Sequence, residues 1–475
     1  MPYVLTVDGE VNADCTISEH NLRISTKGRK PKESTVVLDD IIGIETNDTA
    51  LNVSTDQSKA TKPKWLCKVH YITRKKLLWK QATKCVTGQV EECQRFISDL
   101  QLHFQKVYDQ RPKRFLVLVN PISGGRYGQS NSRRILPLFE LARITCDVKV
   151  SERAKHFEEM LSEYDLSTVD GIVVFGGDGS FCEVLNRLLR ITNEKAGLDY
   201  NDRNGPFKSN TIPIGIIPSG TGNGISVAAF GNYDTVTAAL HIIKGNTCMI
   251  PLMAEYSGDE LLGYASVVSA YGLFADMMYL TDQKRWMRRA RYAVMPFYTI
   301  LLKSQRLFDA ELTLTGSQLC QEDDEEGNKK EEQIDGEFSM VAAFPSKCFG
   351  EAPGEFLILI FRRTPKTHFF KLMGKMLTRD MLREEDFPSL TIRQPTSIRV
   401  KVKPKDLGDK NFLNYLMNID GEIHTMKTAD VTLKSLKNAA RIYSSQHLYP
   451  YPDLQSHTSS TASKSPPDSA CAAEN

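Results

Sequence analysis

The 475-residue sequence lacks the features that mark membrane-spanning, secreted and zinc-binding proteins. It has no run of about 18 apolar residues, and its start, Met1 to Asp8, does not have the layout of a signal peptide. The ten cysteines are scattered, with no Cys-x-x-Cys pair and no Cys/His spacing typical of zinc sites. We therefore expect a reduced intracellular compartment and no structural zinc.

The sequence also lacks an excess of charge of either sign. Its formal net charge is +2, so the total does not point to nucleic acid as a partner. One segment differs: between Asp56 and Glu91 there are nine basic residues and no acidic one, at positions 59, 62, 64, 68, 74, 75, 76, 80 and 84. Two interpretations stay open. The segment is a solvated basic face, or it is attracted to an anionic membrane at about 1 kcal/mol per basic residue.

Residues 1–109 have the pattern of a small β-rich module closed by a helix. Short alternating runs, such as residues 3–7 and 67–72, are separated by turn residues, and residues 90–108 have helical spacing. Several strands followed by one helix favour a pleckstrin-homology-like module. We expect it to serve as a membrane or interaction module.

Three glycine-rich turns dominate residues 111–250. Each follows an apolar run that predicts a buried strand, and the turns are Asn120 to Gly128, Gly176 to Gly179 and Ser219 to Gly224. Strands that alternate with helical patterns indicate a parallel α/β sheet, in which loops at the strand carboxyl ends line one crevice. Free N–H groups at helix starts suit a phosphate. Three such turns within about 105 residues favour a phosphate site over mere tight turns.

Residues 251–449 are rich in strand-like runs, so a second, β-rich unit is expected there. Two basic amphipathic segments interrupt them, at 284–303 and 367–382. Both fit a core-facing helix, and the second, with its aromatic and Met residues, also fits an apolar pocket or a membrane contact. The acidic segment 322–337 is expected to be a loop, and the Ser/Thr/Pro-rich residues 450–475 a disordered tail.

The three turns, together with Asn418-Ile-Asp-Gly-Glu422, resemble in type and order the diacylglycerol-kinase-type catalytic domain of lipid kinases, over about residues 111–445. The similarity is greatest to the sphingosine and ceramide kinase branch. It implies an α/β nucleotide lobe at 111–250, a β-sandwich lipid-binding lobe at 251–449, and ATP between them. It further implies Mg²⁺, a lipid substrate and a cytoplasmic protein attached peripherally to membranes, with no nucleic-acid partner.

The resemblance also implies roles for single residues. Asp178 matches the catalytic base, which accepts the proton of a lipid hydroxyl; a hydroxyl nucleophile needs such an acceptor on chemical grounds as well. Gly176, Gly177, Gly179 and Asp276 are implied to face the lipid. The positions similar to the family's nucleotide contacts are Asn120, Pro121, Ser123, Gly124, Ser151, Arg153, Gly177, Gly179, Gly220, Thr221, Gly222, Arg285, Arg291, Asp420, Gly421 and Glu422. Asp420 and Glu422 also resemble carboxylates on the magnesium side, whereas a second Asp-Gly-Glu, Asp335 to Glu337, is taken as part of the acidic loop.

The signals for the substrate conflict. Gly220-Thr-Gly-Asn-Gly224 and the absence of a ceramide-kinase-like cysteine cluster from 315–348 resemble sphingosine kinases. Met278, however, stands where those kinases place an Asp to hold the substrate's amine, a loss of roughly 1.5–3 kcal/mol unless Asp276 substitutes. This Met resembles ceramide kinase. The sequence narrowly favours sphingosine, then ceramide, then diacylglycerol.

Two other classes share part of this pattern. NAD kinases have a similar Gly-Gly-Asp-Gly turn, but they would not need the basic N-terminal module or the apolar, basic 366–382 segment. A catalytically inert lipid-binding relative would not need Asp178, the glycine turns, the two arginines and the late Asp-Gly-Glu together.

Overall fold

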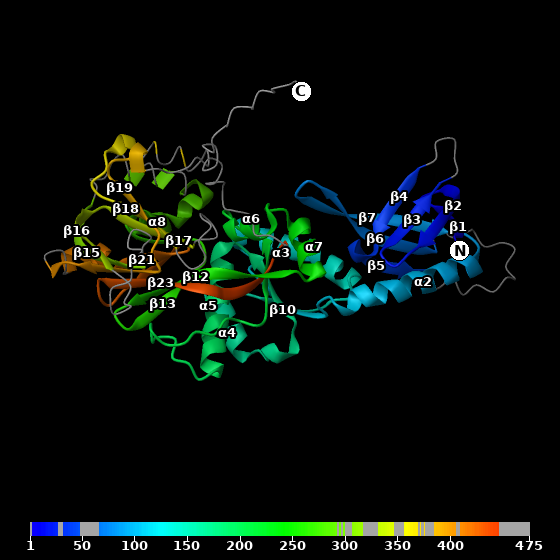
Figure 1. Cartoon of the computed structure of the whole chain (residues 1–475), viewed down its shortest axis with the longest axis horizontal. Helices are drawn as coiled ribbons and strands as arrows, with labels where there is room; N and C mark the ends of the chain where they lie inside the picture. Colours follow the sequence, from blue (N-terminus) through cyan, green and yellow to red (C-terminus); the bar gives the residue numbers. More distant parts are fainter. Residues whose placement is uncertain are drawn as a thin grey trace, which may run out of the picture.

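The computed structural model describes residues 2–26, 32–47, 66–291, 306–316, 331–345, 356–368, 384–404 and 409–445, together with positions 294, 295, 298, 299, 371 and 375. These residues form a mixed α/β fold built on three sheets. Figure 1 shows the N-terminal strands at one end of the molecule and strands β15 to β19 at the other, with the segment of alternating strands and helices between them.

The N-terminal sheet has seven strands among the described residues, in the order β4-β3-β2-β1-β7-β6-β5. Their bounds are β1 Tyr3–Val7, β2 Glu10–Ile17, β3 Asn21–Ser25, β4 Glu33–Val37, β5 Ile41–Thr46, β6 Cys67–Lys75 and β7 Leu78–Thr87. Helix α2 (Val90–Asp109) follows, and its Phe96, Leu100 and Phe104 are buried in the core of this sheet. The predicted strands and closing helix are confirmed, and the pleckstrin-homology-like character stays a prediction.

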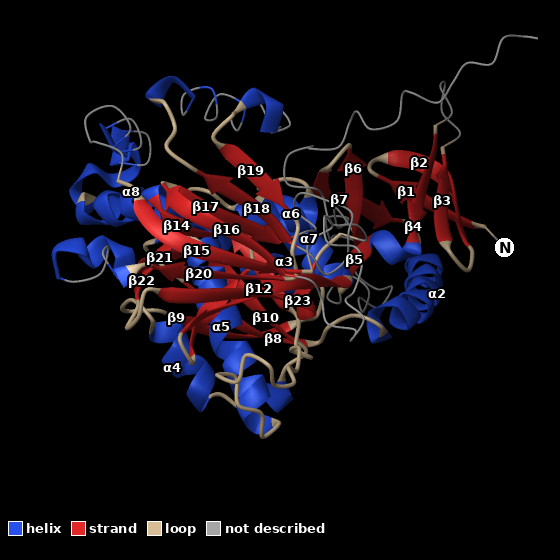
Figure 2. Ribbon diagram, turned by 60° about the vertical axis from the view of Figure 1, so that its left-hand side comes forward, coloured by secondary structure: helices blue, strands red, loops and turns tan. Residues whose placement is uncertain are grey.

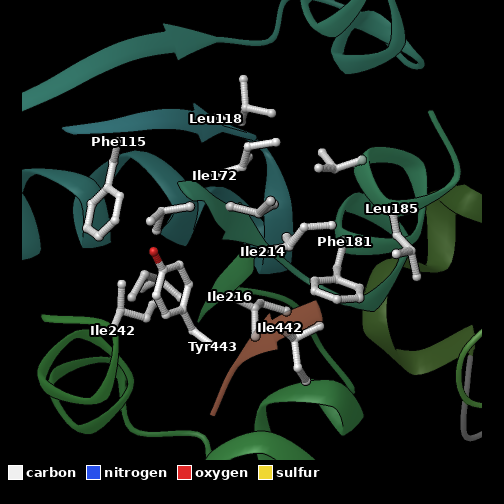
Figure 3. Packing of buried hydrophobic residues seen from close by; sticks show 14 of the residues in the cluster. Phe115, Leu118, Ile172, Phe181, Leu185, Ile214, Ile216, Ile242, Ile442 and Tyr443 are labelled. Carbon is white, nitrogen blue, oxygen red and sulfur yellow. The ribbon is translucent and has the colours of Figure 1, made fainter. Parts of the chain in front are cut away.

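The central sheet contains the parallel strands β11-β10-β8-β9, which are β8 Arg114–Val119, β9 Thr145–Val150, β10 Gly171–Gly176 and β11 Ile214–Pro218. Helices α3 (Ser123–Leu141), α4 (His156–Glu163), α5 (Asp178–Lys195), α6 (Gly224–Phe230) and α7 (Thr235–Lys244) connect or follow them. Every residue of β10 is buried, as a run without polar residues requires in a sheet covered on both faces. Figure 3 shows side chains of neighbouring strands, Phe115, Ile172 and Ile214, packed together in this core.

Six further strands extend the central sheet to ten among the described residues: β12 Thr247–Ser257, β13 Glu260–Ala265, β15 Phe308–Thr315, β16 Glu331–Phe338, β20 Ser397–Val402 and β23 Asp430–Tyr443. The third sheet comprises β14 Ser269–Gly272, β17 Met340–Pro345, β18 Phe356–Phe361, β19 Leu390–Arg393, β21 Leu416–Ile419 and β22 Glu422–Thr425. An apolar cluster with residues from both sheets lies between them, and helix α8 (Leu273–Gln283) contacts β14 and β21. Figure 2 shows the third sheet, with β12, β15, β16 and β20 of the central sheet, above helix α4.

The structure bears on three of the expectations. Residues 331–337 of the acidic segment form strand β16, paired with β15, so the prediction of a loop over 322–337 is wrong for this part, which includes Asp335 to Glu337. The predicted boundary at residue 250 falls inside β12, and one sheet continues across it through β23, so the two-lobed division stays a prediction. The tail at 450–475 lies outside the described residues. No helix in the described part of the chain is long and apolar enough to cross a membrane.

Candidate active site

The three glycine-rich turns lie side by side at one edge of the central sheet. The parallel register pairs Val119 of β8 with Phe175 of β10, and Gly176 of β10 with Pro218 of β11, so each turn starts at nearly the same level. Backbone hydrogen bonds extend the pairing: Asn120 N–H donates to the Phe175 carbonyl and Ser219 N–H to the Gly176 carbonyl. The predicted convergence of the turns is confirmed, because strand carboxyl ends meet at one edge.

The first turn has an unusual backbone. Gly124, Gly125 and Arg126 take positive φ angles of 61°, 93° and 79° before the regular part of α3 begins. Glycine tolerates this region, which most side chains avoid. Asn120 ties the turn to the next one, because its Nδ2 donates to Ser180 Oγ at 2.9 Å. The first turn is thereby fixed to the residues that follow the second turn.

Asp178 is the first residue of α5 and faces the start of α6. Its Oδ2 accepts from the N–H of Gly224 and its Oδ1 from the N–H of Ile225, each at 3.0 Å. Burial raises the pKa of Asp178, the Ile225 and Gly224 N–H groups lower it, and the charge of Asp420 raises it; the net direction is upward. The result is a fixed carboxylate that is more basic than usual.

A cavity of about 1350 Å³ opens beside these turns. Most of the residues predicted for the site line it: Asn120, Pro121, Ser123, Gly124, Ser151, Arg153, Gly177, Asp178, Gly179, Gly220, Thr221, Gly222, Arg291, Asp420, Gly421 and Glu422. They come from both sequence units on either side of residue 250.

Two predicted residues do not line this cavity. Gly176 is buried against Ser180, since a Cβ at position 176 would lie 2.5 Å from the Ser180 Cβ. Asp276 is buried on α8, and both its carboxylate oxygens accept from Arg306, at 2.8 Å each. Its carboxylate is therefore committed to a guanidinium, whereas Met278 of the same helix does line the cavity. The side chain of Arg285 lies outside the described residues.

Asp420 has a different position from the one expected of a metal ligand. Its Oδ1 accepts from the N–H groups of Val267 and Val268, both at 2.8 Å. Its Oδ2 accepts from Ser266 N–H at 2.6 Å, Ser266 Oγ at 2.8 Å and Cys182 Sγ at 3.1 Å. A carboxylate has about four lone-pair sites, so protein donors occupy all of them. Asp420 thus anchors the β21–β22 turn to residues 266–268.

Glu422, on the same turn, remains as the candidate cation ligand. Burial raises the pKa of Glu422, while the charge of Lys155 lowers it. Among the described residues, no three His, Cys, Asp or Glu side chains come together as a metal site of protein ligands would require. The donor set therefore does not fit a metal held by protein alone, and a magnesium ion here would need most of its ligands from the phosphates.

Several lining residues were not predicted. One face of α5 contributes Cys182, Glu183, Asn186, Arg187 and Arg190, at the spacing of three to four residues that shares a helix face. That spacing after Asp178 is visible in the sequence. Glu183 Oε1 accepts from Phe157 N–H at 2.9 Å, and burial raises the pKa of Glu183 to about 7. His424 and Lys155 are brought in by β22 and the loop before α4, and no local pattern marks them.

Comparisons with known proteins show which family and relatives the chain resembles. The diacylglycerol kinase catalytic domain model matches residues 114–254. Human ceramide kinase is 35% identical over 216 residues, 45% of this chain and 40% of that protein. Sphingoid long-chain bases kinase 1 of Arabidopsis thaliana is 33% identical over 203 residues, 42% of this chain and 25% of that protein. The matches thus span less than half the length of these relatives.

A crystal structure of a proposed diacylglycerol kinase from Bacillus anthracis str. Sterne superposes with a TM-score of 0.50, at 17% identity, over 71% of this chain and 96% of that one. This likeness shows a shared fold. Residues 114–254 therefore match the diacylglycerol kinase catalytic domain family, and the relatives that the chain resembles are kinases of the sphingosine and ceramide branch.

Proposed function

We propose that the protein transfers the γ-phosphate of ATP to the primary hydroxyl of a sphingolipid, with Asp178 as the general base. The observation that carries this proposal is the Asp178 carboxylate, held by two N–H donors at 3.0 Å inside a cavity that three glycine-rich turns also line. A hydroxyl nucleophile needs a positioned proton acceptor, and a carboxylate with a raised pKa is a better acceptor than an ordinary one.

ATP supplies the phosphoryl group, and the residues of the chain hold and neutralise it. The glycine-rich turns let backbone N–H groups approach phosphate oxygens closely, and Arg153, Lys155 and Arg291 bring positive charge to the same cavity. Glu422 is the residue we assign to a magnesium ion bound mainly by the nucleotide, and Asp420 supports the turn that carries Glu422.

Two observations favour ceramide over a free sphingoid base as the substrate. A free base carries an ammonium group, but Asp276 is already paired with Arg306, and the cavity position two residues later is Met278. The similarity to human ceramide kinase points the same way. This preference is the reverse of the narrow one drawn from the sequence. Sphingosine remains the second candidate, because Gly220 to Gly224 has the sphingosine-kinase pattern, and diacylglycerol the third.

A lipid substrate implies work at a membrane surface, so we propose a cytoplasmic protein that attaches peripherally. Lys75, Lys76 and Lys80 of the basic segment are exposed. Three other basic residues are ion-paired within the N-terminal sheet, namely Lys68 with Glu45, Arg74 with Asp40 and Lys84 with Asp8. Positions 59, 62 and 64 lie outside the described residues. Charge reversal at Lys75 and Lys76 should weaken binding to anionic liposomes; unchanged binding would refute the attachment.

The test of the catalytic proposal is a kinase assay with labelled ATP and ceramide, sphingosine and diacylglycerol in parallel. Asp178→Asn should keep the fold and ATP binding and abolish phosphorylation, because an amide does not accept the proton. Asp259→Asn, at a position 98% exposed, serves as the matched control and should leave the rate unchanged. Appreciable turnover by Asp178→Asn would remove Asp178 from the role of base.

A further inference from the structure

The N-terminal sheet is attached directly to the helices that follow the third glycine-rich turn. Trp79 N–H, on β7, donates to Thr237 Oγ1 of α7 at 3.0 Å, and that hydroxyl lies 3.4 Å from the Trp79 carbonyl. Next to it, Asn232 Nδ2 of the α6–α7 loop donates to the Leu77 carbonyl at 2.8 Å. The β6–β7 hairpin thus contacts α7 and the loop before it through its backbone.

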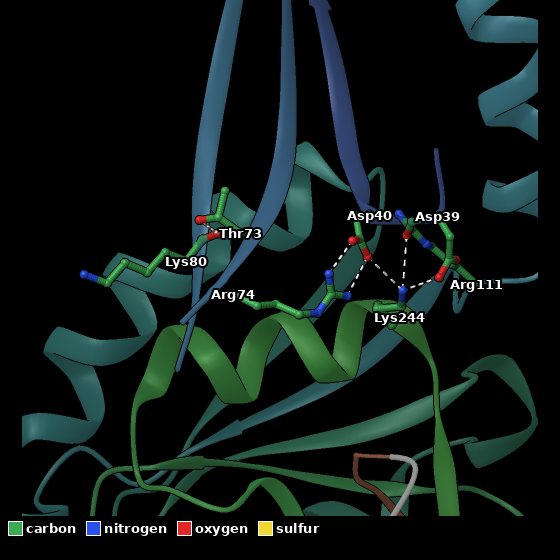
Figure 4. Close-up of polar contacts among 7 residues, drawn as sticks. All are labelled: Asp39, Asp40, Thr73, Arg74, Lys80, Arg111 and Lys244. Carbon is green, nitrogen blue, oxygen red and sulfur yellow. Dashed lines mark hydrogen bonds and ion pairs between the residues drawn. The ribbon is translucent and has the colours of Figure 1, made fainter. Parts of the chain in front are cut away.

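Charged residues fix the same interface at the other end of α7. Figure 4 shows Asp40 between Arg74 of its own sheet and Lys244, the last residue of α7. Asp40 Oδ1 accepts from Arg74 Nη2 at 2.6 Å and from Lys244 Nζ at 3.1 Å. Arg111 adds a hydrogen bond of 2.7 Å to the Ile41 carbonyl. Since Asp40, Lys244 and Arg111 are well buried, the sheet and α7 are held in one geometry.

A stack of three rings continues from the sheet into the catalytic segment. The rings of Trp79 and His241 (α7) lie 3.6 Å apart between centroids, and those of His241 and Phe230 5.4 Å apart with planes 22° from parallel. The Arg74 guanidinium covers the ring of Trp79, 4.3 Å from its centroid. Burial lowers the pKa of His241 to about 4, so its ring is neutral at physiological pH. Trp79, His241 and Phe230 are hereafter the ring stack.

The ring stack ends on α6, the helix whose first N–H groups bind the Asp178 carboxylate. Phe230 is the last residue of α6, a helix of seven residues, and the first two are Gly224 and Ile225, whose N–H groups bind the Asp178 carboxylate. At about 1.5 Å per residue, α6 is only ~10 Å long, too short to bend. Ser226 Oγ also donates to the Asn232 carbonyl at 3.0 Å, which closes the helix onto the loop that contacts Leu77. A displacement at Phe230 therefore moves the donors of Asp178.

We propose that Trp79 and His241 are positioning residues for Asp178, so that docking of the N-terminal sheet sets the geometry of the proposed base through α6. This inference rests on the role proposed for Asp178. Without the ring stack, α6 loses its support at Phe230, and the Gly224 and Ile225 N–H groups no longer hold the carboxylate in place. The N-terminal sheet is then a structural part of the catalytic centre as well as a proposed membrane module.

The expected signature follows from what the two N–H groups do. They orient the carboxylate, and they lower its pKa against the effect of burial and of Asp420, the carboxylate of the β21–β22 turn. Their loss misplaces the base and raises its pKa. Because the base must be deprotonated to act, kcat should fall and the acidic limb of its pH profile should move to higher pH.

The experiment uses the full chain, a short-chain ceramide in detergent micelles and the variants Trp79→Ala, Trp79→Phe and His241→Ala. We expect Trp79→Ala and His241→Ala to lower kcat roughly tenfold or more, because small misplacements of a catalytic group are costly. Both variants should move the acidic limb of the kcat–pH profile to higher pH. Trp79→Phe, which keeps a ring, should restore most of the rate. Leu78→Ala, at the exposed residue just before Trp79 on β7, is the control and should behave like the wild type.

A double-mutant cycle tests whether Trp79 and His241 act on Asp178 through the same contacts or whether each substitution lowers kcat independently. If the path is shared, Trp79→Ala with His241→Ala together should cost about as much as either alone. Thr237→Val removes the hydrogen bonds to the Trp79 backbone together with the one from Thr237 Oγ1 to Asp234 Oδ2 at the start of α7. It should give a milder change of the same kind, and it replaces Trp79→Ala if that variant does not fold. Wild-type kcat and pH profile in folded Trp79→Ala and His241→Ala would overturn the inference. Turnover by Asp178→Asn would instead remove Asp178 from the role of base, on which the inference rests.

Discussion

The backbones of Gly177 and Gly220 are in contact. A Cβ built on Gly220 would lie 2.4 Å from the Gly177 Cα, and one built on Gly177 would lie 2.9 Å from the Gly220 Cα. The second and third glycine-rich turns therefore meet with no side chain between them. This is how two turns more than forty residues apart in the sequence form one wall of the cavity.

Substitution at this contact should damage the site. Gly220→Ala forces the backbones apart, and overpacking of this kind costs about 1–3 kcal/mol. We expect a lower melting temperature and a loss of ATP binding by calorimetry. Gly179→Ala is the contrast, because its Cβ would meet only Glu422 Oε1 at 3.5 Å and the fold should tolerate it. Equal loss of stability in both variants would refute this reason for the glycine.

Glu183 should make stability depend on pH. Burial raises its pKa from 4.5 to about 7, so its contribution is fully present below about pH 4.5 and is lost as pH rises through 7. Glu183→Gln, which still accepts from the Phe157 N–H, should therefore gain stability relative to the wild type at pH 8 but not at pH 4. Glu183→Ala should lose stability at both, since it leaves that N–H unpaired. Urea unfolding at the two pH values measures the difference.

Replacing Asn418 by an apolar residue should stabilise the protein. The side chain is fully buried on β21, and neither amide atom has a hydrogen-bond partner in the described structure. An unpaired buried polar group costs about 1–3 kcal/mol, so Asn418→Leu should raise the free energy of unfolding. Asn193→Leu is the matched control: Asn193 is also buried but bonds the Leu189 and Lys208 backbones, so its loss should destabilise. Destabilisation by Asn418→Leu would contradict the prediction.

Substitution of Asp420 should lower stability, whereas substitution of Glu422 should change the dependence of the rate on magnesium. In Asp420→Asn one carboxylate oxygen becomes an amide N–H₂ that faces backbone N–H donors, either that of Ser266 or those of Val267 and Val268, so the substitution should destabilise the protein by more than about 2 kcal/mol. Glu422→Gln should leave stability close to that of the wild type and raise the magnesium concentration needed for half-maximal rate. Melting curves and a magnesium titration of the rate measure both. The reverse pattern would make Asp420 the cation ligand.

Met278 should influence the choice of lipid. Met278→Asp places a carboxylate at the cavity, and a charge-assisted hydrogen bond to an ammonium is worth roughly 1.5–3 kcal/mol. We expect the ratio of kcat/KM for sphingosine over ceramide to rise by about tenfold or more. Met278→Leu should leave the ratio unchanged. A ratio unaffected by Met278→Asp would show that position 278 does not face the amine.

Much of the sheet and its turns could be predicted from the sequence alone. The strands before the three turns are short apolar runs, and the helices after them have apolar residues every three to four positions. Both are local patterns that backbone hydrogen bonding imposes. Asp178, Gly177 and Gly220 each belong to such a strand-to-turn unit, and parallel strands bring those units to one edge. The roles of these residues in catalysis and nucleotide binding were implied by the resemblance to lipid kinases.

Only the tertiary structure decided what the side chains from other elements do. The Asp276 carboxylate pairs with Arg306, thirty residues away in the sequence. The Asp420 carboxylate accepts hydrogen bonds from residues 266–268, more than 150 residues away. The link from Trp79 to Asp178 likewise depends on contacts between distant elements. A sequence shows which groups can donate or accept, but long-range packing determines which partners they meet, and therefore which carboxylates remain for chemistry.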